Sequence, residues 1–303
     1  MAKGRNNGNK KLLIGIIAVV FIIGAAVSAL VNDGDEAFET AGLRDTDTAP
    51  KSGEMTVSFI DVGQGDCTLL TEGDTVILVD AGESFAAETV VRYMQNLGID
   101  EIDCLIATHP HSDHIGGLPE VMESFTVGDV IMTDLPEELV PTTKTYENFL
   151  IAVSENSKRV LPASPGETYS YGEIDIEILG PISESDNLNS MSVVARASYG
   201  NTSVMLTGDA EKDEEKDITE KFPDLSADLL KVGHHGSKTS TSADWLEAVN
   251  SQYAVISCGE DNDYGHPNSV TLDRLDKYGV EYYRTDLLST VVFVSDGNRF
   301  VKK

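Results

Sequence analysis

Three histidines and an aspartate lie within six residues of one another, in the segment His109-Pro-His-Ser-Asp-His114. Imidazole and carboxylate groups together are ligands for divalent transition metals, most often zinc. Side chains at positions i and i+2 of an extended stretch point the same way, so His109 and His111 can bind one ion together. Asp113 and His114 then face elsewhere and can bind a second ion. A histidine-rich surface loop is the alternative. It is disfavoured because five of the six histidines directly follow strand-like runs.

Two later strand ends carry residues of the same chemical type. Leu206-Thr-Gly-Asp209 ends a strand on a glycine turn, and each oxygen of the Asp209 carboxylate can bind one of two ions. The alternative role for Asp209 is to cap the following helix. Val232-Gly-His-His235 ends another strand, and we expect His234 to be the ligand. His235 either replaces it as the ligand or orients the substrate.

Several other polar residues could support such a site. His266 could donate a proton to the leaving group, or it could cap or pack against a helix. Asp61, Gln64 and Asp66 share a glycine turn between strands, where the acids could lie beside the metals or make turn hydrogen bonds. Asp80 ends a strand and could orient a ligating histidine. Ser237 begins a hydroxyl-rich loop that could bind an anionic group or cap the next helix.

Charge is distributed unevenly along the 303 residues, whose formal net charge is -29. Residues 1–31 contain four bases and no acid, so the remainder carries 18 bases against 51 acids. Such a body should repel nucleic acid and anionic membranes beyond about 8 Å, the Debye length at physiological salt. A polyanionic substrate would therefore have to be captured locally by metal. Acidity that only keeps an exported protein soluble is the simpler interpretation.

The three cysteines suggest buried free thiols and no disulfide framework.

The first 53 residues differ in composition from the rest. Residues 1–11 are basic, and residues 12–31 are nearly all apolar, which is long enough to span the hydrocarbon core of a bilayer. The bases predict a cytoplasmic N-terminus and a cell-membrane protein with its body outside the cytoplasm. A cleaved signal peptide would make the protein secreted instead. Residues 32–53 predict a flexible acidic linker.

From residue 54 to residue 303 the pattern alternates between strands and helices and predicts one α/β domain. The predicted strands are 55–60, 67–71, 75–79, 102–107, 174–179, 193–197, 203–206, 228–232, 254–257, 281–283 and 291–294. The predicted helices are 84–97 (capped by Ser84), 118–125, 146–154, 210–221, 243–249 and 269–278.

Taken together, the motifs His109-Pro-His-Ser-Asp-His114, Leu206-Thr-Gly-Asp209 and His234-His-Gly-Ser237 resemble the metallo-β-lactamase superfamily. Asp61-Val-Gly-Gln-Gly-Asp66 and Tyr264-Gly-His-Pro267 narrow the resemblance to the extracytoplasmic domain of ComEC-type DNA-uptake competence proteins. The resemblance covers nearly all of residues 54–303. It implies a four-layer αββα sandwich with metals at one edge of the paired sheets.

The resemblance also implies a set of ligands. One ion would be held by His109 and His111, the other by Asp113, His114 and His234, with Asp209 bridging them. Many binuclear members have a further histidine before the bridging aspartate, but none lies between His114 and His234 here. Asn189 and Ser192 fall where the subgroup often carries Asn and Ser. Because an amide oxygen is a weaker ligand, the first ion could bind loosely, or be manganese rather than zinc.

The reaction implied is hydrolysis by a water molecule activated between two divalent metal ions, with Asp113 as a ligand or as the proton acceptor. The expected substrate is a small or polymeric phosphodiester, including DNA bound at the active site only. Alternatives are a lactone, a β-lactam or a choline-type phosphoester. A membrane-tethered binding protein without catalysis is a third interpretation. The sequence indicates a membrane contact through its N-terminal helix and no partner protein.

Overall fold

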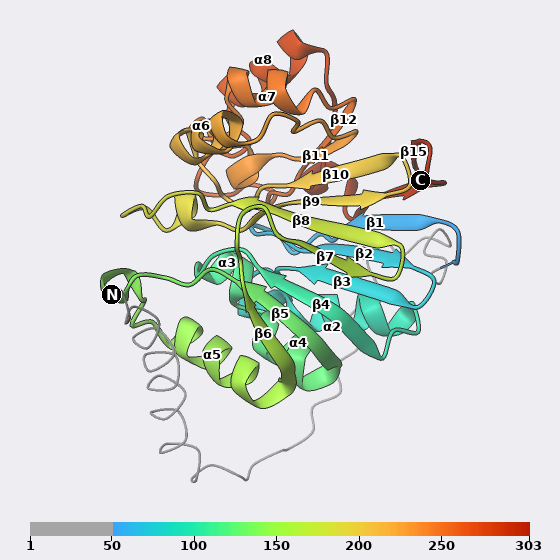
Figure 1. The fold of residues 1–303 in the computed structure, drawn as a ribbon, viewed down its shortest axis with the longest axis vertical. Helices are drawn as coiled ribbons and strands as arrows, with labels where there is room; N and C mark the ends of the chain where they lie inside the picture. Colours follow the sequence, from blue (N-terminus) through green and yellow to red (C-terminus); the bar gives the residue numbers. More distant parts are fainter. Residues whose placement is uncertain (1–50) are drawn as a thin grey trace, which may run out of the picture. The chain divides into compact units, whose positions relative to one another are not determined.

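Two β-sheets pack face to face, and helices cover the outer face of each (Figure 1). The computed structural model describes residues 51–303. The basic segment, the apolar segment 12–31 and nearly all of the linker lie outside the described residues. Within residues 51–303, every helix is too short or too polar to cross a bilayer.

The first sheet has the strand order β15-β14-β1-β2-β3-β4-β5-β6. Strands β3 to β6 run parallel to one another, whereas the other neighbours are antiparallel. The strands are β1 (Met55–Phe59), β2 (Thr68–Glu72), β3 (Thr75–Val79), β4 (Glu101–Ala107), β5 (Thr126–Met132), β6 (Ser157–Pro162), β14 (Val291–Ser295) and β15 (Phe300–Lys302).

The second sheet has the order β13-β12-β11-β10-β9-β8-β7, and its strands β10 to β13 are parallel. The strands are β7 (Thr168–Tyr171), β8 (Ile174–Gly180), β9 (Val194–Tyr199), β10 (Thr202–Leu206), β11 (Leu229–Lys231), β12 (Tyr253–Ile256) and β13 (Glu281–Arg284). The inner faces of the two sheets share one apolar layer that includes Val57, Phe59, Ile176 and Phe293. Burying each such side chain contributes about 1.5–3 kcal/mol.

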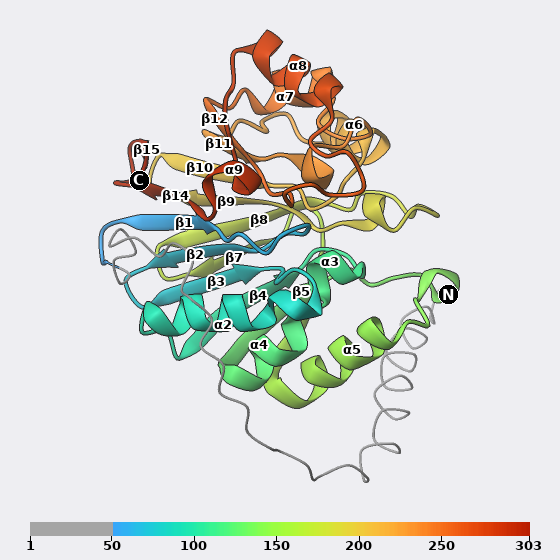
Figure 2. The same ribbon diagram turned by 180° about the vertical axis from the view of Figure 1, so that it is seen from behind.

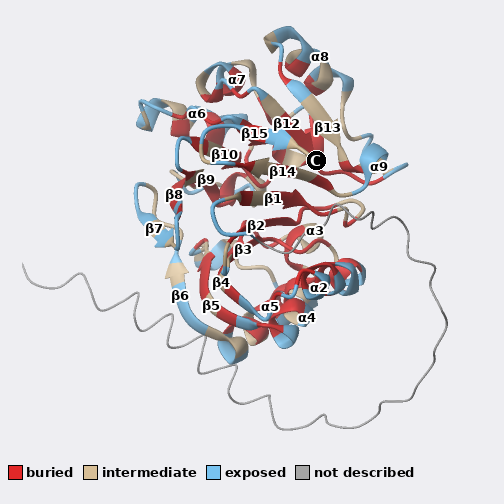
Figure 3. Ribbon diagram, turned by 90° about the vertical axis from the view of Figure 1, so that its right-hand side faces the viewer, coloured by how far each residue is buried: buried red, intermediate tan, exposed pale blue. Residues whose placement is uncertain are grey.

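Two groups of helices form the outer layers. On the first sheet lie α2 (Ala87–Asn96), α4 (Leu118–Ser124) and α5 (Lys144–Asn156); on the second lie α6 (Lys212–Lys221), α7 (Ala243–Val249) and α8 (Ser269–Tyr278) (Figure 2). The buried residues concentrate on the strands and on the helix faces toward them (Figure 3). The short helices are α3 (Ser112–Ile115), α9 (Thr285–Leu288), η1 (Ser84–Ala86), η2 (Glu137–Leu139), η3 (Asn189–Met191) and η4 (Gly233–Gly236). This αββα arrangement confirms the predicted fold.

The structure corrects several predicted elements. The helix expected from Ser84 begins with η1 and continues as α2, and Ser84 is not its cap. The acidic helix begins at Lys212 rather than Ala210. Strands β5, β6, β7 and β15 were not predicted. All residues of β6 and β7 are exposed or half-buried, so these strands lack the apolar alternation that identifies a strand.

Helix α6 fixes the loop that follows β8. The Ile182 N–H donates to Glu214 Oε1 at 2.7 Å, and Glu214 is buried. Burial raises the pKa of this carboxyl to about 7, although the hydrogen bond from Ile182 opposes the shift. The folded state therefore holds a proton that the unfolded chain releases above its ordinary pKa of 4.5. This contribution to stability is fully present below that value and is lost as the pH rises through about 7.

Glu214→Gln should remove this part of the pH dependence. Glutamine stays neutral at every pH and keeps an oxygen that can accept from Ile182. We expect the variant to be more stable than wild type at about pH 8 and to lose less stability between about pH 5 and about pH 8. Thermal unfolding followed by circular dichroism at both pH values tests this. Parallel pH profiles for the two proteins would contradict it.

Candidate metal centre

The predicted metal-binding residues follow the carboxyl ends of parallel strands in both sheets. His109 follows β4, Asp209 follows β10, and the pair His234–His235 follows β11. Parallel strands end at one edge of a sheet, so the loops after them lie side by side. A backbone hydrogen bond from Val193 N–H to Thr108 O (2.8 Å) joins the two sheets at this edge.

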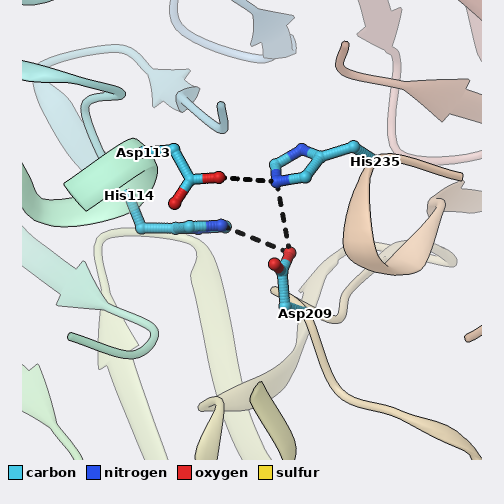
Figure 4. A group of neighbouring side chains, drawn as sticks. All are labelled: Asp113, His114, Asp209 and His235. Carbon is cyan, nitrogen blue, oxygen red and sulfur yellow. Dashed lines mark ion pairs between the residues drawn. The ribbon is translucent and has the colours of Figure 1, made fainter. Parts of the chain in front are cut away.

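Four side chains form a compact group whose ligand atoms all lie within 4.8 Å of one another: Asp113, His114, Asp209 and His235 (Figure 4). His114 Nε2 lies 3.2 Å and His235 Nε2 lies 3.6 Å from Asp209 Oδ1. His235 Nε2 also lies 3.2 Å from Asp113 Oδ2. The two Nε2 atoms and Asp209 Oδ1 are buried without a hydrogen-bond partner. Because buried polar atoms need partners, and two imidazoles with two carboxylates suit a divalent cation, these residues fit a metal ion.

The structure corrects the histidine expected in this group. His235, rather than His234, lies beside Asp113 and His114. Both adjacent histidines have a left-handed backbone, with φ values of 49° and 52°. Spacing in the sequence does not reveal this conformation, which decides which of the two imidazoles points inward.

The outer nitrogens of these two histidines are held by buried acceptors. His114 Nδ1 lies 2.7 Å from Asp80 Oδ2, the carboxylate for which an orienting role was predicted. His235 Nδ1 lies 3.0 Å from Ser257 O and 3.2 Å from Asp66 Oδ1. A hydrogen bond at Nδ1 fixes the tautomer that leaves the Nε2 lone pair free for a metal. Both Nε2 atoms are therefore directed into the compact group.

The second oxygen of Asp209 faces a different set of imidazoles. His109 Nε2 lies 3.8 Å from Asp209 Oδ2 and 3.0 Å from His111 Nδ1. The outer nitrogen of His109 is near the hydroxyls of Thr108 (3.2 Å) and Ser192 (3.3 Å). The Ser192 hydroxyl also accepts from the Asp209 N–H at 3.1 Å. Asp209 therefore lies between two imidazole sets, as a bridging carboxylate would.

The alternative role of Asp209 as a helix cap is wrong. Helix α6 begins at Lys212, and its N-cap residue is Glu211. The Asp209 side chain is buried and directed toward the histidines.

Lys231 is a buried cation beside the centre that the sequence analysis missed. Its side chain is 2% exposed, and its Nζ lies 2.7 Å from Asp66 Oδ2. Asp66, Asp80 and His114 also lie within metal-binding distance of one another. The Lys231 ammonium already supplies the positive charge there, so we assign the carboxylates of Asp66 and Asp80 to orienting the histidines rather than to metal binding. A lysine within the apolar run Leu229–Val232 was the signal that could have revealed it.

Charge in the centre favours a cation. Burial opposes protonation of His235, but Asp209 and Asp66 outweigh it and raise its pKa to about 10. Burial likewise disfavours the ionised form of Asp113, but the close contact with His235 and the charge of His114 hold its pKa well below the usual value. Positive charge is thus stabilised between these carboxylates. Asp113 is a poor proton acceptor because its pKa is low, so ligation is its better-supported role.

His266 lies over the adjacent histidines. Its ring centroid is 5.5 Å from that of His234 and 6.3 Å from that of His235. Burial, together with those two histidines, lowers the pKa of His266 to about 4. The imidazole is therefore uncharged at neutral pH, which disfavours the proton-donor role expected for it.

The remaining predicted residues lie around the centre rather than within it. Asp61 accepts from the Gly63 N–H at 3.1 Å, which is the turn hydrogen bond that was its alternative role. Gln64 Oε1 accepts from Gly259 N–H. The Ser237 hydroxyl lies 3.0 Å from the hydroxyl of Thr239, and Ser237 belongs to neither group of candidate metal-binding side chains among the described residues. Asn189 lies 3.5 Å from Glu211, and its buried Oδ1 has no hydrogen-bond partner.

Several curated proteins with similar sequences are competence proteins. ComE operon protein 3 of Bacillus subtilis is 29% identical over 261 residues, which are 80% of this chain and 33% of that protein. Recombination protein 2 of Haemophilus influenzae is 33% identical over 230 residues, which are 73% of this chain and 26% of that protein. This chain thus spans about a third or less of those relatives. A shorter match, 26% over 107 residues, covers 34% of this chain and 36% of Exodeoxyribonuclease YycJ of Bacillus anthracis.

Solved structures and family models agree on the fold. The metallo-β-lactamase fold protein YhfI from Bacillus subtilis aligns with a TM-score of 0.55 and 17% identity, over 80% of this chain and all of that one. The model of the Metallo-beta-lactamase superfamily matches residues 60–260, the region that carries every candidate ligand described above. The chain therefore belongs to the metallo-β-lactamase superfamily, and its curated relatives include ComEC-type competence proteins.

Proposed function

We propose that this chain is a metal-dependent phosphodiesterase with a nuclease-like activity. The observation that carries the proposal is the position of Asp209, whose two oxygens face two separate imidazole sets. Two divalent cations, when bound, lower the pKa of a water molecule and stabilise charge on the attacking and leaving oxygens of a phosphoryl group. The names of the relatives support the substrate class, since one is named an exodeoxyribonuclease and another a competence protein.

The chain's own residues hold and orient the centre. Asp80 and Asp66 fix the rings of His114 and His235, and Lys231 neutralises Asp66. The half-buried His266 covers one side of the site, where its neutral imidazole can donate a hydrogen bond to the substrate without transferring a proton.

The net charge limits how a nucleic acid could bind. At -29 for the whole chain, the surface does not attract a long polyanion. A phosphodiester would be captured at the metal centre alone. We therefore favour short or single-stranded substrates, or chain ends, over a tract of duplex DNA.

The proposed location is outside the cytoplasm. This proposal is based on the basic residues that precede the apolar segment 12–31. If that segment is not cleaved, it retains this domain at the membrane, and if it is cleaved, the domain is released.

Activity on substrates of different classes tests the function. The full chain, purified in detergent and supplied with zinc or manganese, should hydrolyse bis-p-nitrophenyl phosphate and end-labelled single-stranded DNA. The comparison substrates are nitrocefin, an acyl-homoserine lactone and p-nitrophenylphosphorylcholine. If the protein hydrolysed only one of these three comparison substrates, the class of that substrate would replace the phosphodiester in the proposal. Absence of turnover on all five substrates by a metal-loaded protein would favour the binding protein.

A further inference from the structure

His234 and His235 are adjacent in the sequence, but their imidazoles approach different oxygens of Asp209. His235 Nε2 lies 3.6 Å from Oδ1, within the compact group. His234 Nε2 lies 3.6 Å from Oδ2, the oxygen that His109 Nε2 approaches at 3.8 Å. The adjacent rings are separated by 6.0 Å between centroids, at an interplanar angle of 73°.

The local backbone accounts for this divergence. Both histidines have left-handed dihedral angles within η4, φ 49° and ψ 49° for His234, and φ 52° and ψ 25° for His235. A non-glycine residue adopts this conformation only with backbone strain, and such strain concentrates at functional sites. Backbone hydrogen bonds from His234 N–H to Gly208 O (3.1 Å) and from Ser237 N–H to His234 O (2.7 Å) hold the turn in place.

Each imidazole also has its own carboxylate at the outer nitrogen. His234 Nδ1 lies 3.4 Å from Glu211 Oε1, and that oxygen accepts from the Thr239 hydroxyl at 3.0 Å. His235 Nδ1 lies 3.2 Å from Asp66 Oδ1. Two independent carboxylates thus direct two Nε2 atoms inward, which is the arrangement that positions metal-ligating histidines.

We propose that the two adjacent histidines bind different metal ions. His235 completes the site with Asp113 and His114, and His234 completes the site with His109 and His111, with Asp209 shared. His234 thereby supplies the third imidazole for which the sequence offers no histidine between positions 114 and 234. This assignment concerns the metals and does not depend on the substrate.

The two sites should differ in affinity. All ligand atoms of the compact group lie within 4.8 Å of one another, and that group does not include His109, His111 or His234. The side chain of His234 is 21% exposed, whereas that of His235 is 2% exposed. The site completed by His234 is therefore more open, and we expect its ion to dissociate more readily.

Metal stoichiometry of a matched pair of variants tests the assignment. Glycine adopts positive φ without strain, so His234→Gly and His235→Gly each remove one imidazole without adding backbone strain. The full chain in detergent is dialysed against manganese and its bound metal is measured by atomic emission. Wild type should bind two equivalents and each variant one, with at least about 100-fold weaker binding of the lost ion, since removing an outer-shell partner alone costs 10–100-fold. His266→Ala, the control, should keep both.

Combined variants show which ligands share an ion. His111→Ala with His234→Gly should still bind one equivalent, because both changes affect the same site. His111→Ala with His235→Gly should bind none. Electron paramagnetic resonance should show coupled manganese in wild type and isolated manganese in His234→Gly. Wild type saturating at one equivalent, His234→Gly keeping two, or the first combination binding none would each overturn the assignment.

A milder variant covers the case in which a glycine variant fails to fold. Glu211→Gln leaves every ligand in place and removes only the charge behind His234. It should weaken the binding of the ion held by His234 by about 10–100-fold and leave the affinity for the other ion unchanged. Unchanged affinity for both ions, with a native circular dichroism spectrum, would count against the assignment.

Discussion

Asp209→Asn should lower kcat/KM for the phosphodiester by at least about 10³-fold, which corresponds to about 4 kcal/mol of transition-state stabilisation. Asparagine preserves the size of the side chain and one of its oxygens. It loses the negative charge and the second oxygen that could bind a metal ion. Asp209 is the carboxylate that faces both imidazole sets, at 3.2 Å from His114 Nε2 and 3.8 Å from His109 Nε2. Bound metal should also fall by at least one equivalent, and this can be measured on the sample used for the kinetics.

The control is Asp61→Asn, the same chemical change at another strand end. Asp61 accepts a turn hydrogen bond from Gly63 N–H, which asparagine can also accept. We expect its kcat/KM to stay within about 3-fold of wild type, a difference below 1 kcal/mol. If Asp209→Asn kept both turnover and two metal equivalents, the bridging role would be wrong.

Lys231→Met should destabilise the fold by about 3–5 kcal/mol, because it leaves the buried Asp66 carboxylate without its partner. The Lys231 Nζ lies 2.7 Å from Asp66 Oδ2 and donates to Val232 O at 2.9 Å. Burial works against the ionised form of Asp66, and the Lys231 ammonium is the largest opposing influence that lowers its pKa. Urea unfolding of the metal-free protein, followed by fluorescence of the single tryptophan, Trp245, measures the loss.

A double substitution distinguishes this electrostatic cause from a packing defect. Lys231→Met combined with Asp66→Asn removes both charges, so the double variant should be less destabilised than the sum of the single changes. Strict additivity would indicate that the lysine contributes packing alone. The double variant should also bind the ion of the compact group more weakly, since Asp66 orients His235.

The sequence by itself determined the type of chemistry and the positions of most of its residues. His109, His111, Asp113 and His114 are close in the chain, and short-range geometry predicts that they divide between two sites. Asp209 and the histidine pair follow apolar runs that the period of two and the turn residues identify as strands. The resemblance to a known family, rather than the strands alone, implied that these strand ends share one site at an edge of the paired sheets, and this agrees with the rule that parallel strands end at the same edge.

The tertiary structure decided what depends on backbone conformation and on distant partners. The left-handed angles at His234 and His235 determine which imidazole joins Asp113, and adjacent residues at a strand end carry no local pattern for this. The pairing of Lys231 with Asp66 joins residues 165 positions apart, and sequence spacing does not encode such a contact. The exposed strands β6 and β7 form through pairing with their neighbours, since hydrogen bonds between strands are non-local and these segments lack an apolar face.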